Sequence, residues 1–168
     1  MPSEMTVSRT PKSEYDALEN FLDAQRIGLI RKVEDVSDEL ARQAPTASSL
    51  SLLGLIKHAA TWERRWFQVI MAGRTSPDGW PEVMPEPRDA ELISHDSDTV
   101  ANWIAVYREH IETSNTIAAA MDLDALCART DLIECNLRYV LLHMIEETAR
   151  HAGHADIIRE TLDGSRGI

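Results

Sequence analysis

Four long segments of the chain carry apolar side chains every three or four residues, and this spacing constrains the fold more than any other feature. In the first segment the positions at roughly helical spacing are Leu18, Phe21, Leu22, Gln25, Leu29 and Val33. The alternation of apolar and polar residues that is typical of strands does not occur in the sequence. We therefore predict an all-α protein whose amphipathic helices, each of about 20–25 residues, form a four-helix bundle.

Capping residues indicate where these helices begin and end. We predict helices over residues 13–33, 49–71, 97–121 and 137–163, with a short helical turn over residues 38–43. Ser49 and Asn136 are suitable N-caps because their side-chain oxygens can accept a hydrogen bond from the first helical turn. Gly73 and Gly164 follow the second and fourth helices, and a glycine commonly ends a helix.

The connection between the second and third helices is long and rich in proline. Residues 74–96, RTSPDGWPEVMPEPRDAELISHD, contain four prolines, which exclude a regular helix through most of the segment. We expect this connection to cross the bundle or to line a site. Among the tryptophans, Trp80 in this connection is the one that we expect to contact a substrate, and the others to lie in the core. The composition shows no break, so we predict a single domain over residues 1–168.

Composition excludes two classes of partner. The formal net charge of −11 opposes binding to the phosphate backbone of nucleic acids. No stretch approaches the roughly 20 apolar residues of a membrane span, and the N-terminal residues lack the apolar stretch of a signal peptide. Cys127 and Cys135 match no common metal motif, so we expect two free thiols in a cytoplasmic protein.

The segment HMIEETARHAGHADIIRE, residues 143–160, places ionisable side chains where a helix needs apolar ones. At about 100° per residue, His151 falls near the centre of the apolar face and Glu147 lies on its flank, one turn away. A buried ionised carboxylate is unfavourable unless it has a partner, which can be a buried cation or a metal ion. The i, i+4 spacing allows Glu147 and His151 to converge on one metal ion.

The second helix offers a third ligand. His58 lies at the edge of the apolar face of residues 51–67. Together, His58, Glu147 and His151 would form a ligand set that fits zinc first and also suits nickel, iron(II) or manganese. The alternatives are a boundary histidine at position 58 and a Glu–His pair on the surface.

Two other ionisable residues need a partner or a role. His154 is a candidate for a side chain that orients a metal ligand without binding the metal, and its alternative is a boundary histidine. Glu63 falls near the middle of the apolar side of the second helix. We predict that Glu63 forms a buried ion pair with an arginine such as Arg150 or Arg159.

The segments SLLGLIKHAATWERRWF, residues 51–67, and LRYVLLHMIEETARHAGHADIIRETLDG, residues 137–164, closely resemble the two signature blocks of the domain-of-unknown-function 664 family. That family belongs to the DinB-like superfamily, which also contains mycothiol-dependent maleylpyruvate isomerases and bacillithiol S-transferases. Both blocks occur in the expected order and separation, and the resemblance covers most of the chain. It implies a bundle of the DinB-like type with a divalent metal ion bound by three side chains.

The resemblance also implies which residues bind the metal: His58 from the second helix, and Glu147 with His151 from the fourth. Most of the superfamily has histidine at the position of Glu147, whereas the maleylpyruvate isomerase branch resembles this chain in having glutamate. Glutamine is usual at the position of His154, so the role of His154 stays open. We expect no counterpart of the C-terminal domain of the isomerases, so their substrate is not carried over. The superfamily commonly forms homodimers.

Three hypotheses of function follow. In the first, which the resemblance favours, a metal-bound small thiol attacks an electrophile, as in a metal-dependent thiol S-transferase or a thiol-assisted isomerase. In the second, metal-activated water makes the protein a hydrolase. In the third, the bundle binds metal or dimerises without catalysis. The first hypothesis predicts a small thiol and an electrophile as partners. The sequence assigns no catalytic group beyond a metal-bound thiolate or water.

Overall fold

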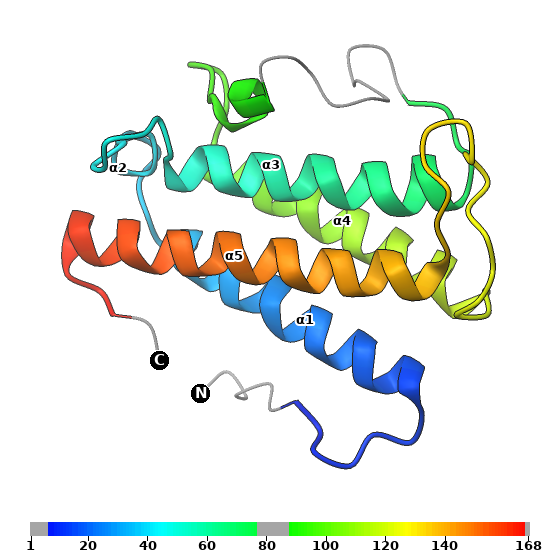
Figure 1. Cartoon of the computed structure of the whole chain (residues 1–168). Coiled ribbons are helices and arrows are strands. Elements are labelled where there is room, and N and C mark those ends of the chain that lie inside the picture. The colour runs from blue at the N-terminus through cyan, green and yellow to red at the C-terminus, as the bar shows by residue number, and fades with distance from the viewer. Residues whose placement is uncertain (1–6, 77–87, 167–168) are drawn as a thin grey trace.

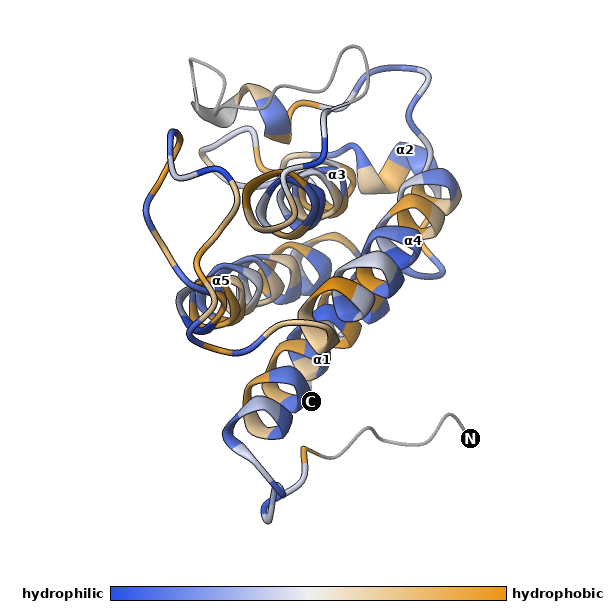
Figure 2. Cartoon of the chain, turned by 90° about the vertical axis from the view of Figure 1, so that its right-hand side faces the viewer, coloured by the Kyte–Doolittle hydropathy of each residue, from blue (hydrophilic) through white to orange (hydrophobic). Residues whose placement is uncertain are grey.

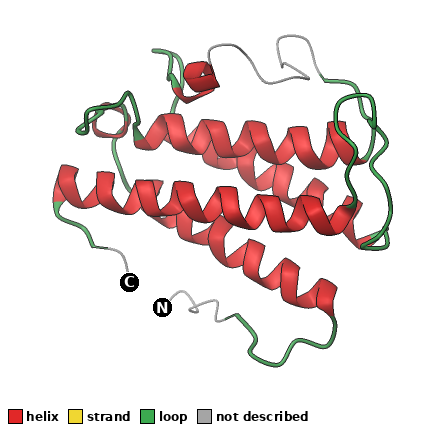
Figure 3. Ribbon diagram, viewed as in Figure 1, coloured by secondary structure: helices red, strands yellow, loops and turns green. Residues whose placement is uncertain are grey.

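The computed structural model describes residues 7–76 and 88–166, and most of these residues are helical (Figure 1, Figure 3). The helices are α1 (Glu14–Val33), α2 (Asp38–Ala41), α3 (Leu52–Arg64), η1 (Arg65–Met71), η2 (Arg88–Leu92), α4 (Val100–Ala119) and α5 (Leu137–Asp163). Within the described ranges there is no strand, and one isolated bridge joins Leu126 to Asn136. The predicted all-α bundle is confirmed: its long helices are α1, α3 continued by η1, α4 and α5.

Side-chain caps fix the ends of the long helices. Asn136 caps α5 as predicted, since its side chain accepts a hydrogen bond from a first-turn amide at 3.0 Å, and Gly164 ends the helix with a φ of 78°. The N-cap of α3 is Ser51 rather than Ser49, because the hydroxyl of Ser51 accepts the first-turn hydrogen bond at 3.0 Å. The third long helix, α4, begins slightly later than predicted because Thr99 caps it.

The bundle consists of two closely packed helix pairs. α1 packs most extensively on α5, and α3 on α4. α3 and α5 also lie side by side, with fewer contacts between them (Figure 1). Figure 2 views the bundle from one end, and hydrophilic and hydrophobic residues both occur on each long helix. We call this less extensive contact between α3 and α5 the seam.

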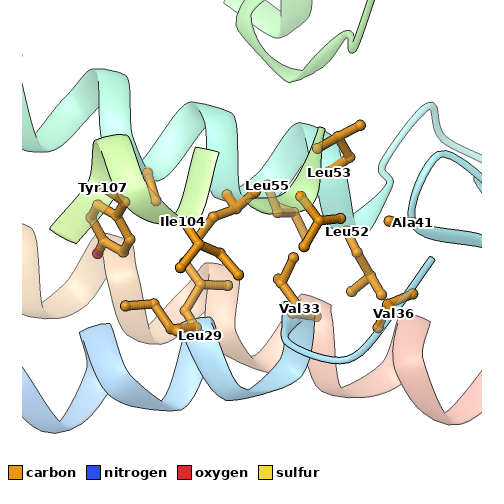
Figure 4. Close-up of a cluster of buried hydrophobic side chains, with 14 of the residues drawn as sticks. Leu29, Val33, Val36, Ala41, Leu52, Leu53, Leu55, Ile104 and Tyr107 are labelled. Carbon is orange, nitrogen blue, oxygen red and sulfur yellow. The ribbon is translucent and has the colours of Figure 1, made fainter. Parts of the chain in front are cut away.

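Two hydrophobic clusters fill the interior. The first includes Leu29, Val33, Leu52, Leu55 and Tyr107, which are labelled in Figure 4. The second includes Trp62, Phe67, Leu137, Leu141 and Met144. On α3 the change from the first cluster to the second falls between Ala60 and Trp62, and on α5 it falls between Met144 and Ala155. A polar layer therefore separates the two clusters, and the sequence-predicted site residues lie in it or at its edge.

The buried face of α1 differs from the predicted face. Phe21, predicted to face the core, is 50% exposed, whereas Arg26 is only 2% exposed. The prediction was wrong at Phe21 because helical spacing alone does not fix which side of α1 faces the other helices. Arg26 takes a core position because its guanidinium group has a buried carboxylate partner, Glu63 on α3.

Glu63 is fully buried and forms an ion pair, as predicted, but the predicted partners were wrong. Arg26 donates from Nε to Glu63 Oε2 at 3.2 Å and from Nη2 to Oε1. Arg150 and Arg159 instead pair with carboxylates of their own helix, α5. The sequence pattern identified a buried charge but could not identify which helix supplied the opposite one.

The connection after η1 returns to the face of α3. Residues 77–87, including Trp80, lie outside the described residues, so the role expected of Trp80 stays a prediction. η2 contacts α3 closely: a Cβ atom added at Gly54 would lie 1.9 Å from the carbonyl oxygen of Leu92. Glycine at position 54 therefore permits this close approach. Among the described helices, none combines the length and apolarity needed to cross a bilayer.

Candidate metal centre

The seam between α3 and α5 brings together the three predicted ligands. His58 extends from α3, and Glu147 and His151 extend from successive turns of α5. Glu147 Oε1 lies 2.9 Å from His151 Nε2 and 3.5 Å from His58 Nε2. One ligand atom from each residue lies within 4.8 Å of the other two. Ligands at about 2.0–2.2 Å from zinc stand roughly 3.4 Å apart, so these separations suit one ion.

Unsatisfied nitrogen atoms mark the same place. Both ring nitrogens of His58 and Nδ1 of His151 are buried without a hydrogen-bond partner among the described residues. A buried polar atom without a partner is unfavourable. A cation bound between the imidazoles would give His58 Nε2 the partner that it lacks. The donor set therefore fits a divalent metal ion.

The charge states of the three side chains also suit a cation. Burial lowers the pKa of His58, although Glu147 partly opposes this effect. The hydrogen bond with His151, followed by the interaction with His58, holds the pKa of Glu147 well below its usual range. At neutral pH the arrangement thus favours a neutral imidazole at His58 beside an ionised carboxylate, and metal ligands need these forms.

Arg150 fixes the orientation of Glu147. Its Nη1 donates to Glu147 Oε2 at 2.6 Å, while Oε1 faces the two imidazoles. The side chain of Arg150 also binds Glu146, which is exposed. Two adjacent glutamates therefore share one arginine, but of the two only Glu147 contacts the histidines in the described structure.

His154 lies beside the site, and its buried Nδ1 has no hydrogen-bond partner among the described residues. Its ring centroid is 5.5 Å from that of His151, in an edge-on arrangement. Burial and then the neighbouring His151 lower the pKa of His154. The orienting role expected of His154 stays a prediction.

Aromatic rings continue the site along the seam. These rings belong to Trp62, Trp66, Tyr139 and His143. The ring centroid of His143 lies 4.5 Å from that of Trp66. The His143 ring also stacks parallel to the Tyr139 ring, with the two centroids 6.0 Å apart. Trp62 lies beside the first candidate ligand, with its ring centroid 5.2 Å from that of His58. Trp62 and Trp66 are both buried, as expected of core tryptophans.

One carboxylate near the centre was missed by the sequence analysis. Glu91, on η2, lies with Oε2 3.7 Å from His58 Nδ1. The indole N–H of Trp62 donates to the same oxygen at 2.9 Å, and Arg65 binds both oxygens. Glu91 follows the proline-rich connection, where no helical period relates its position to His58. No local sequence signal would have found it.

The metal-free protein is expected to lose stability as the pH falls from about 7.5 to about 5.5. Burial lowers the pKa of His58 in the folded state, so the unfolded chain binds more protons in this range. The neutral imidazole of His58 makes its full contribution to the free energy of unfolding above about pH 6.5. This contribution is lost as the pH falls towards the lower pKa of the folded state. For His58 the loss at about pH 5.5 is at most about 1.4 kcal/mol.

Urea unfolding at these pH values, with a chelator present, measures the effect. The His58→Gln variant is the control, and its stability should depend less on pH than that of the parent. Burial also lowers the pKa of His110, so some dependence should remain in the variant. Equal pH dependence in the parent and the variant would contradict the expected contribution of His58.

Comparisons with known proteins agree with the fold. The family model described as Mycothiol-S-transferase matches residues 17–164, a range that contains most of α1, all of α3, α4 and α5, and the three candidate ligands. A crystal structure of a conserved protein from Enterococcus faecalis is similar, with a TM-score of 0.69 over 91% of this chain and 99% of that chain. At 12% identity, that likeness concerns the fold alone. No curated protein matched. Because the family match spans most of its length, the chain belongs to the mycothiol-S-transferase family.

Proposed function

We propose that this protein is a divalent-metal-dependent S-transferase that joins a small thiol to an electrophile. The observation that carries the proposal is the convergence of His58, Glu147 and His151, whose ligand atoms lie within 4.8 Å of one another. Membership of the mycothiol-S-transferase family supports a small thiol, mycothiol or a chemical relative, as the nucleophile. We expect zinc as the metal because two imidazoles and one carboxylate form a typical set of catalytic zinc ligands.

The ligand set leaves coordination positions free for a further group. A divalent cation bound there would lower the pKa of a thiol that reaches it, so that the nucleophilic thiolate is available near neutral pH. The thiol sulfur would form a bond to an electrophilic carbon, the leaving group would depart with its bonding electrons, and the thiol proton would pass to solvent. Arg150 would keep Glu147 in place throughout.

The protein's own cysteines are unsuited to supply the sulfur. Both are free and buried. Burial, reinforced by Cys127, raises the pKa of Cys135 to about 12, so its thiolate is scarce at neutral pH. The thiol of Cys127 donates to the backbone carbonyl of Ile133 at 3.0 Å. A thiol cosubstrate is therefore the better source of the nucleophile.

An assay with a chromogenic aryl halide as the electrophile tests this proposal. The zinc-loaded protein should accelerate consumption of the halide when mycothiol or another small thiol is present, and the His151→Ala variant should not. Turnover of the halide by the zinc-loaded protein without any thiol would point to water as the nucleophile and contradict the proposal. Failure across a panel of thiols with several classes of electrophile would also count against it.

A further inference from the structure

We propose that Glu91 is a positioning residue that accepts a hydrogen bond from His58 Nδ1–H and thereby holds His58 Nε2 towards the metal ion. The inference rests on the proposed function only in requiring a metal ion at the site. Glu91 belongs to η2 and is brought to the metal centre by the packing of η2 on α3.

Three donors surround one carboxylate oxygen of Glu91. The Trp62 indole N–H lies 2.9 Å from Oε2, Arg65 Nη1 lies 3.3 Å from it, and His58 Nδ1 lies 3.7 Å from it. Arg65 Nη2 binds the other oxygen. The Glu91 side chain is only 8% exposed. Trp62 and Arg65 hold the carboxylate in place, and a shift of under about 1 Å would bring His58 to hydrogen-bond distance.

His58 needs such an acceptor once Nε2 binds a metal ion. The proton of the neutral imidazole is then on Nδ1, a buried atom without a hydrogen-bond partner among the described residues. Metal-bound histidines usually donate this second N–H to a carboxylate, a carbonyl or water, which fixes the ring and increases its basicity. Glu91 Oε2 is the carboxylate oxygen that the structure places opposite Nδ1.

Asp98, which binds the residue next to His58 on α3, provides a matched control. Lys57 donates to Asp98 Oδ2 at 2.9 Å, and the Trp103 indole N–H donates to Asp98 Oδ1 at 2.9 Å. Asp98, like Glu91, therefore binds one indole and one cationic side chain where the connection meets α3. No contact between Asp98 and His58 is described. Asp98→Asn should loosen this junction without changing the environment of His58.

Zinc affinity, measured by competition with a chromophoric chelator, tests the proposal. Glu91→Gln keeps the size of the side chain and removes its charge, and it should weaken zinc binding by about 10–100-fold. Asp98→Asn should bind zinc as the parent does. The visible spectrum of the cobalt(II)-loaded protein should change in Glu91→Gln, because the geometry at the ion changes, and should not change in Asp98→Asn.

Unchanged zinc affinity and an unchanged cobalt spectrum in Glu91→Gln would overturn the proposal, as would equal weakening in both variants. If Glu91→Gln fails to fold, nitrogen-15 NMR of the zinc-loaded parent tests whether His58 Nδ1–H is hydrogen-bonded. A low-field, slowly exchanging Nδ1–H signal of His58 supports the hydrogen bond, and a rapidly exchanging one overturns it. A parent that binds no metal refutes the proposed function itself, so the two failures are distinguishable.

Discussion

Replacing Glu63 with alanine is expected to lower the free energy of unfolding by about 3–5 kcal/mol. The replacement would leave the guanidinium group of Arg26 buried without its principal counter-charge. Burial disfavours the charged form of Arg26, but Glu63 together with Tyr107 and Asp23 outweighs this effect, so the pKa of Arg26 is raised. Asp23 and Asn115 still accept hydrogen bonds from Arg26 Nη1, at 2.7 and 2.8 Å. The loss in the free energy of unfolding should therefore lie towards the lower end of this range.

Urea unfolding of Glu63→Ala beside Glu34→Ala measures this effect. Glu34 also pairs with an arginine, Arg108, but on the exposed surface, so its removal should cost at most about 1 kcal/mol. Replacing Arg26 and Glu63 together with leucine should recover much of the stability, because no charge then stays buried alone. A loss of under about 1 kcal/mol in Glu63→Ala would contradict the importance of the buried pair.

Replacing Glu147 with glutamine is expected to weaken zinc binding by more than about 100-fold, which exceeds the usual cost of losing a partner that only orients a ligand. Glu147 Oε1 faces both imidazoles, and the carboxylate is held ionised. Glutamine has nearly the same size but supplies no charge to offset that of a divalent cation. Competition with a chromophoric chelator at neutral pH measures the affinity.

The adjacent glutamate is the matched control for this change. Glu146 binds the same arginine, Arg150, but its side chain is 66% exposed, against 13% for Glu147. Glu146→Gln should therefore retain the parent affinity for zinc. Equal affinities for the Glu146→Gln and Glu147→Gln proteins would mean that Glu147 is not a metal ligand.

Features that depend on neighbours in the chain could be predicted from the sequence. Helical spacing and capping side chains indicated the four long helices, and Asn136 and Gly164 delimit α5 as expected. The inward direction of Glu147 and His151 followed from the helical wheel, because a helix fixes residues four apart on one face. His58 could be predicted as the third ligand from its place on the apolar face of another helix and from the family resemblance.

Features that depend on packing between distant segments could not be predicted in this way. Arg26 is charged and lies on α1, so periodicity gave no reason to place it against Glu63. Glu91 reaches His58 because η2 packs on α3, an approach that Gly54 permits. Phe21 is exposed although it is apolar. For Arg26 and Glu91 the deciding contact joins elements whose relative position the local pattern does not specify.

Elemental analysis of the untagged protein, purified without chelators, tests the central claim most directly. The His58→Ala and His151→Ala variants belong in the same experiment, since they remove one ligand from each of the two helices. We expect about one divalent metal ion per chain in the parent and none in either variant, with both variants still helical by circular dichroism. A parent that holds no metal, even after dialysis against zinc, nickel and manganese, would contradict the metal centre and the proposed transferase with it.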